Sequence, residues 1–198
     1  MSNYRPAKRP SQDKVQLLPL PEAPERLSWF TMKDNDTRDT PADLFSELVD
    51  LYGRPFAIDV CACHSNTKVP ACYYTLEGLA SNGAIVRPGV DGMTGRWPAD
   101  WFCNPPFSEI GRWIRRAWQA NQAGLLIVPN SKGEQPWWQE LVEPHRDGRP
   151  PYDGALMCLS THYLPKRRRF LKDGKPILSS KTGQVGSPGF GLVALVWK

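Results

Sequence analysis

Residues 101–107 read Trp-Phe-Cys-Asn-Pro-Pro-Phe, and they predict a strand that ends in a rigid turn. An apolar, aromatic run leads into two consecutive prolines, and a helical pattern begins at Ser108. Each proline disfavours helical geometry in the residue before it, so Asn104 and Pro105 are both expected to be extended. Neither proline can donate a backbone hydrogen bond. The turn therefore presents acceptors, namely the Asn104 side-chain oxygen and the Pro105 carbonyl.

Two fixed acceptors beside the aromatic ring of Phe107 suit a flat ring that carries an amino group. The alternative is an ordinary Pro-Pro turn that only closes a strand. The strand before the turn and the predicted helix after it, over residues 108–123, favour the binding site.

The bulk composition indicates one domain with tails and a polyanionic partner. The chain has 198 residues, with 25 Lys and Arg against 20 Asp and Glu, a net charge of +5 and a pI of about 9.0. No apolar run approaches the roughly 20 residues that span a bilayer. The N-terminus does not resemble a signal peptide. With five cysteines, these features predict free thiols in a reducing cytoplasm and no membrane association.

A cysteine cluster raises the question of a metal. Cys61, Cys63 and His64 are close in sequence, and Cys72 follows. A zinc site usually brings two ligand pairs, and here the second pair is missing. We therefore expect thiols and no metal.

Two segments before the turn have clear patterns. Residues 40–53 predict an amphipathic helix, with Thr40 as its N-cap, Pro41 in the first helical position and Gly53 as its stop. Residues 55–62 predict a buried strand with Asp59 near its carboxyl end. A carboxylate in this position lies at the mouth of an open α/β sheet, where ligands bind.

The remaining pattern predicts an α/β fold. Strand and helix alternate after the turn, which implies parallel pairing; the segments are a helix at 108–123, a strand at 124–129, a helix at 134–142 and a strand at 155–159. The tail from 169 to 197 is punctuated by glycine and proline and predicts an antiparallel hairpin. Residues 1–27 predict a flexible, basic, proline-rich arm, which leaves 28–198 as the folded domain.

The Asn-Pro-Pro-Phe sequence at 104–107 resembles the catalytic motif of class I methyltransferases that act on exocyclic or amide nitrogens. Together with other segments, it is similar to the phage-type DNA N-6-adenine methyltransferases (Dam-like). Those segments are Thr-Pro-Ala-Asp-Leu-Phe at 40–45, Ile-Asp-Val-Cys-Ala at 58–62, and Asp-Gly-Met at 91–93 followed by Trp97. The resemblance runs from about Trp29 to the C-terminus. It implies a Rossmann-like, mostly parallel sheet with helices on both faces and a C-terminal antiparallel hairpin.

The same resemblance implies methyl transfer from S-adenosylmethionine to the N-6 amine of adenine in double-stranded DNA, after the base is flipped out. The setting it implies is restriction–modification in a bacterium or a bacteriophage-infected cell. The implied catalytic residues are Asn104, Pro105, Pro106 and Phe107, and the implied donor-binding residues are Thr40, Pro41, Asp59, Cys61 and Asp91.

Two features leave this assignment open in places. Glu77, in Glu77-Gly78-Leu79, is a rival to Asp91, and residues 81–90 are then either an insertion or a displaced loop. Residues 63–66 also lack the glycine-rich turn that is usual in class I enzymes.

Lys166, Arg167, Arg168 and Arg169 form the densest cationic run, and no acidic run lies near them along the chain. Beside a base-modifying site, we expect them to bind DNA phosphates.

Three other functions remain open. They are a cytosine methyltransferase, a class that more often has Ser in place of Asn104; an RNA or protein-glutamine N-methyltransferase; and a catalytically inactive nucleic-acid-binding relative.

Overall fold

The structure is a computed structural model that describes residues 38–76, 79–81, 84–87, 89–130, 132–172, 174–178, 185 and 190–198. The predicted basic arm at 1–27 and the rival carboxylate Glu77 lie outside the described residues.

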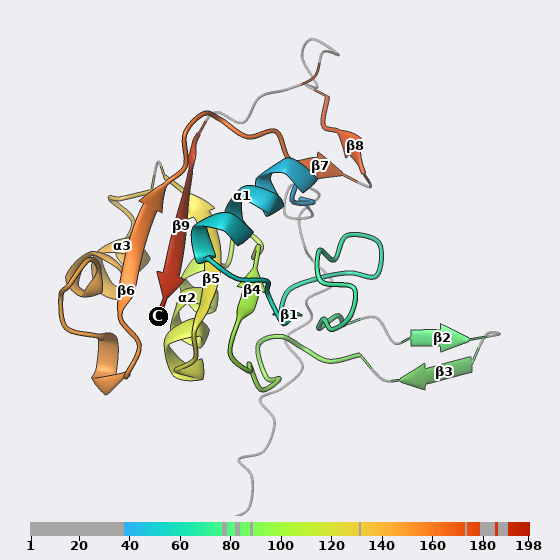
Figure 1. Ribbon diagram of the computed structural model, residues 1–198, viewed down its shortest axis with the longest axis horizontal. Coiled ribbons are helices and arrows are strands. Elements are labelled where there is room, and N and C mark those ends of the chain that lie inside the picture. Colours follow the sequence, from blue (N-terminus) through green and yellow to red (C-terminus); the bar gives the residue numbers. More distant parts are fainter. Residues whose placement is uncertain are drawn as a thin grey trace, which may run out of the picture. The chain divides into compact units, whose positions relative to one another are not determined.

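Five strands pair in one sheet, in the order β1-β4-β5-β9-β6 (Figure 1). The parallel strands are β1 (Ile58–Asp59), β4 (Trp101–Cys103) and β5 (Gly124–Pro129). β9 (Leu192–Trp197) is antiparallel both to β5 and to β6 (Leu159–Tyr163). Every residue of β4, β5 and β9 is buried, as in strands whose two faces are both covered. The predicted α/β class with a mostly parallel sheet is confirmed.

Helices cover both faces of this sheet. Successive side chains of a strand point in opposite directions, so a strand with apolar residues throughout has two faces to bury. Phe102 and Leu125 pack in one cluster with α1 (Ala42–Tyr52). Cys103 and Leu126 pack in the other, with α2 (Ile110–Ala120) and α3 (Pro136–Leu141). No helix in the described part of the chain is long and apolar enough to cross a membrane.

Some predicted boundaries are wrong. The N-cap of α1 is Pro41, in extended geometry and without a side-chain cap bond, whereas the Thr40 hydroxyl accepts a hydrogen bond from Asn104. The strand predicted at 155–159 begins only at Leu159; the short helical turn η3 (Tyr152–Gly154) and residues 155–158 precede it. β9 pairs antiparallel with β5 and β6, and not with another strand in the described part of the tail from 169 to 197.

Two small hairpins lie outside the main sheet. β2 (Leu79–Ser81) and β3 (Ala84–Arg87) pair antiparallel in the segment between β1 and β4. β7 (Leu171–Lys172) and β8 (Lys175–Pro176) form the second hairpin, which is joined to the segment before α1 by an antiparallel bridge between Asp39 and Leu171.

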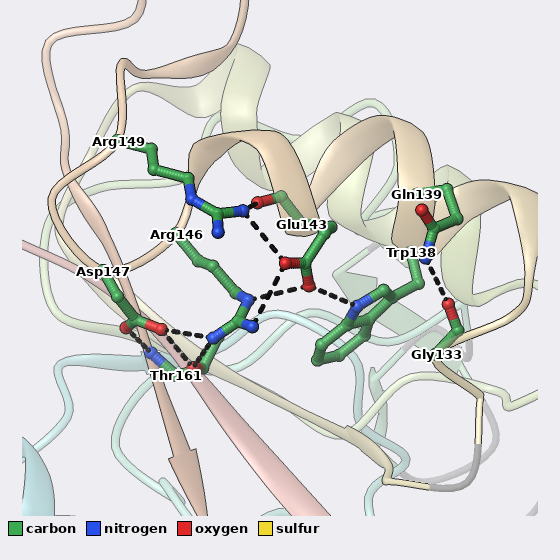
Figure 2. A network of polar contacts seen from close by, with 8 residues as sticks. All are labelled: Gly133, Trp138, Gln139, Glu143, Arg146, Asp147, Arg149 and Thr161. Atoms are coloured by element: carbon green, nitrogen blue, oxygen red, sulfur yellow. Dashed lines mark hydrogen bonds and ion pairs between the residues drawn. The ribbon is translucent and has the colours of Figure 1, made fainter.

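A charged network fastens the turn η2 (Glu143–His145), which follows α3, to β6 (Figure 2). The Glu143 carboxylate accepts from Arg146 Nε at 2.9 Å and from Arg149 Nη1 at 2.9 Å. Arg146 also contacts Asp147, which in turn accepts from the backbone N–H of Thr161 at 2.8 Å. The neighbouring Arg146 is the main reason that the pKa of Glu143 is lowered, to about 2.

Candidate active site

The site lies at the carboxyl ends of two neighbouring parallel strands. Asp59 of β1 pairs with Phe102 of β4, so Cys61 and Asn104 follow at the same edge of the sheet. Ligands of open α/β sheets bind at such edges. The thiols of Cys61 and Cys103 also meet here: burial, and then the bond to the Cys61 thiol, raise the pKa of Cys103 well above its ordinary value.

The side-chain amide of Asn104 is held by the segment before α1. Asn104 Nδ2 donates to the Arg38 carbonyl at 2.8 Å and to Thr40 Oγ1 at 3.1 Å. A backbone carbonyl can only accept, so the atom that faces Arg38 must be the amide nitrogen. Both bonds use the amide nitrogen, and the Asn104 side-chain oxygen accepts no hydrogen bond within the described residues.

The two prolines behave differently from each other. Both are buried, and the Pro106 carbonyl accepts from the Glu109 N–H at 3.0 Å, which leads the chain into α2. The Pro105 carbonyl has no hydrogen-bond partner in the part of the chain that the structure describes. Among the residues that the structure describes, none occupies the two predicted acceptors, the Asn104 oxygen and the Pro105 carbonyl, which lie at one turn.

Phe107 lies beside this turn, half-buried, with its ring fixed by two other aromatic rings. Its centroid is 5.7 Å from that of Phe170 and 5.9 Å from that of Phe190, both in edge-to-face geometry. Phe190 is next to Gly191, whose N–H donates to Asn130 Oδ1 at 3.1 Å. Asn130 directly follows β5, so the third parallel strand also supports the site.

The turn at Asp91 and Gly92 packs against the end of β1. A Cβ on Gly92 would lie 2.0 Å from the Val60 carbonyl oxygen, so only glycine fits here. Asp91 Oδ1 accepts from the Met93 N–H at 2.8 Å. Trp97 Nε1 donates to the Gly92 carbonyl at 2.6 Å from a buried position. The Asp-Gly-Met element at 91–93 and the Trp97 that follows it are thus joined in one fixed turn.

Two further side chains hold the same loop, and neither contact was predicted from the sequence. Arg116 on α2 donates to the Gly95 carbonyl at 2.6 Å, and its guanidinium lies 5.3 Å from the centre of the Trp97 ring. Burial lowers the pKa of Arg116. The Tyr74 hydroxyl donates to the Arg96 carbonyl. Helical periodicity marks Arg116 only as a polar residue of α2, so the sequence contains no signal for this contact.

Asp59 is buried, with 3 % of its surface exposed, and its carboxylate is directed into the following loop. Oδ1 accepts from the Cys61 N–H at 3.2 Å and Oδ2 from the Lys68 N–H at 3.3 Å; the Thr67 side chain adds a further bond. Burial outweighs these bonds and raises the pKa of Asp59 to about 6. Asp59 therefore fixes the conformation of residues 61–68.

The β2–β3 hairpin precedes Asp91 in the chain, and the residues on its two sides lie close together. The Val90 N–H donates to the Thr75 carbonyl at 2.8 Å. A Cβ on Gly89 would lie 2.2 Å from the Leu76 carbonyl oxygen, so the two ends of the segment are in close contact. This geometry favours an insertion over a displaced loop for residues 81–90.

The four residues of the cationic run differ in their exposure. Lys166, Arg167 and Arg169 are exposed. The Arg168 side chain is 18 % exposed and forms ion pairs with Asp43 at 3.5 Å and with Glu47, both on α1. No acidic run is near Arg168 along the chain, but the fold brings two carboxylates of α1 to it, a pairing that the local sequence does not reveal.

Comparison with known proteins agrees with this geometry. A family model of the DNA N-6-adenine-methyltransferases (Dam) matches residues 28–147, more than half of the chain. The match includes β1, β4, β5, α1 to α3 and the Asp91 turn. No curated protein and no solved structure matches the chain significantly. The chain belongs to the DNA N-6-adenine-methyltransferase (Dam) family.

Proposed function

We propose that this member of the family transfers a methyl group from S-adenosylmethionine to the N-6 amine of adenine in duplex DNA. The observation that carries the proposal is the pair of available acceptors, the Asn104 side-chain oxygen and the Pro105 carbonyl. The mostly parallel sheet, with helices on both faces and an antiparallel β9, also supports the class I methyltransferase fold.

The acceptor pair suits the chemistry of an adenine amine. The lone pair of this nitrogen is delocalised into the ring, which makes it a poor nucleophile. The Asn104 oxygen and the Pro105 carbonyl accept hydrogen bonds from its two N–H groups, which localises the lone pair and aims it at the methyl carbon. The N–C bond forms as the C–S bond breaks, S-adenosylhomocysteine leaves, and the methylated amine then loses one proton to solvent. Positioning and fixed dipoles supply most of the rate enhancement, so no strong base is required.

The residues at the end of β1 fit a methyl donor of this kind. When bound, S-adenosylmethionine supplies an electrophilic methyl group on a sulfonium. The close packing of Gly92 on Val60 leaves the Asp91 carboxylate at the edge of the sheet, with one oxygen engaged by the Met93 N–H. We assign Asp91 to direct donor contact, and Asp59 to holding Cys61 and the loop after it in place.

Thr40 and Pro41 would border the same pocket, because Thr40 contacts Asn104 directly. The target adenine is stacked inside a duplex, so it has to be flipped out to reach Asn104. Phe107 would then stack on the base, since its T-shaped contacts with Phe170 and Phe190 fix the plane of its ring.

We assign the binding of DNA phosphates to Lys166, Arg167 and Arg169, which are exposed on the segment between β6 and β7. Arg168 has a structural role, because its ion pairs with α1 hold this segment against the domain. Phosphate contacts position the protein on DNA without reading its sequence.

The test is to identify the product. The protein is incubated with methyl-labelled S-adenosylmethionine and, separately, with duplex DNA, RNA and protein, and the modified unit is identified by mass spectrometry. N-6-methyladenine in DNA is the expected result. Label in cytosine, in RNA or in glutamine would replace the proposal with the corresponding alternative, and no label in any substrate would leave an inactive nucleic-acid-binding relative.

A further inference from the structure

We propose that Thr40 is a positioning residue, which together with the Arg38 carbonyl locks the Asn104 amide so that its oxygen, and not its nitrogen, faces the target amine. The inference rests on the proposed function and deepens it. Arg38 and Thr40 lie on either side of Asp39 and accept from the same nitrogen of Asn104, at 2.8 Å and 3.1 Å.

The orientation of the amide decides whether the site works. Rotation by half a turn about the last side-chain bond of Asn exchanges oxygen and nitrogen, and this torsion is broad and roughly two-fold. In the exchanged state the Asn104 oxygen would face the Arg38 carbonyl, which is also only an acceptor. The amide nitrogen would then face the target amine, so that two donors oppose each other. An unlocked Asn104 would spend part of its time in this unproductive state.

The segment that provides the lock is itself anchored. The Asp39 N–H donates to the Leu171 carbonyl at 2.8 Å, and the Leu171 N–H donates back to Asp39 at 3.1 Å. Asp39 Oδ2 also accepts from the Gly174 N–H at 2.9 Å. In an extended chain, the polar groups of neighbouring residues point to opposite sides. Pairing of Asp39 with β7 therefore directs the Arg38 carbonyl the other way, towards Asn104.

Burial makes the lock effective. Thr40 is 3 % exposed and Asp39 is 8 % exposed, so water does not readily replace a lost partner. Removal of one buried hydrogen bond leaves the other group unsatisfied and favours its rearrangement. The Thr40 hydroxyl is also not used to cap α1, which leaves it to accept from Asn104.

The experiment compares Thr40→Val, which keeps the shape and removes the acceptor, with Thr40→Ser, which keeps the acceptor. Methyl transfer is measured in a single turnover at saturating S-adenosylmethionine and DNA. We expect Thr40→Val to slow the step roughly tenfold, the effect of about one lost hydrogen bond. Thr40→Ser should recover most of the rate. Thr161 lies on the edge strand β6, and its hydroxyl is bonded to Asp147. Thr161→Val is therefore the matched control for loss of a threonine hydroxyl.

A double-mutant cycle shows whether Thr40 acts through Asn104. In an Asn104→Ala background there is no amide to orient, so Thr40→Val should cause no further loss. An equal loss in both backgrounds would overturn the proposal. So would a Thr40→Ser variant as slow as Thr40→Val, or a Thr40→Val variant that only weakens donor binding in calorimetry.

A second measurement does not depend on activity. The side-chain amide protons of Asn104, identified in the NMR spectrum by their loss in Asn104→Ala, should exchange slowly with solvent in the wild type and much faster in Thr40→Val. Unchanged exchange would reject the lock even if methyl transfer were slowed. Slow exchange in a protein that methylates no DNA would retain the lock and reject the proposed function, so the two failures are distinguishable.

Discussion

Replacement of Asp59 by Asn removes a buried carboxyl group whose titration couples folding to pH. Burial raises the pKa of Asp59 from its ordinary value of 3.8 to about 6 in the folded protein. The folded state therefore binds a proton more tightly than the unfolded state. Between these two values the folded protein holds a proton that the unfolded chain has lost, so the free energy of unfolding falls as the pH rises.

The size of this effect follows from the two pKa values. A difference of one pKa unit corresponds to about 1.4 kcal/mol, so the contribution of Asp59 should decline by about 3 kcal/mol across this range. It is fully present below pH 3.8 and is lost once the pH has passed about 6. The Asn variant has no proton to release at this position, and this part of the pH dependence should be absent from it.

The assay is urea unfolding of both proteins at several pH values from 3.5 to 7.5, with the difference in unfolding free energy plotted against pH. Asn also alters the bonds to Cys61 and Lys68, so a constant offset is expected and only the slope is diagnostic. The difference should change in favour of Asn by about 3 kcal/mol as the pH rises. A flat difference, or a slope of the opposite sign, would refute the conclusion that burial controls this carboxyl group.

Two further predictions concern the donor loop and the basic segment. Gly92→Ala places a methyl group 2.0 Å from the Val60 carbonyl oxygen, so the Asp91 turn must move. Calorimetry should then show at least about tenfold weaker binding of S-adenosylmethionine, equivalent to about 1.4 kcal/mol. Unchanged affinity would show that the turn does not hold the donor. Neutralising Lys166 and Arg167 together should weaken binding to target and non-target DNA alike. The slope of the logarithm of the binding constant against the logarithm of salt concentration should become less steep by about 0.9 for each lost phosphate contact. A changed ratio between the affinities for target and non-target DNA would instead indicate that these residues read bases.

The parts of the fold that the sequence predicted are those that depend on local pattern. β5 was predicted with both ends correct, because an uninterrupted apolar run matches a strand buried on both faces. α1 was predicted from its apolar stripe and from Gly53, which takes the left-handed conformation and donates to the Val49 carbonyl. The strand before Asn104 and the helix after it were predicted for the same reason.

The contacts that the sequence analysis missed join residues that are distant along the chain. Thr40 and Asn104 are separated by 64 positions, and a threonine before a helix is by itself a good capping residue, so the local rule gave the wrong role. Arg168 and Glu47 are separated by 121 positions. Periodicity does not report such pairs, because they exist only once the sheet has brought the segments together.

The central claim is that the Asn104 side-chain oxygen accepts a hydrogen from the adenine amine during methyl transfer. Its most direct test is the single-turnover rate of Asn104→Ala on duplex DNA at saturating S-adenosylmethionine, with donor affinity measured in parallel. The rate should fall by at least about 10²-fold, as for removal of a key electrostatic group, while the donor affinity stays close to that of the wild type. A variant that transfers methyl groups to adenine at nearly the wild-type rate would contradict the claim.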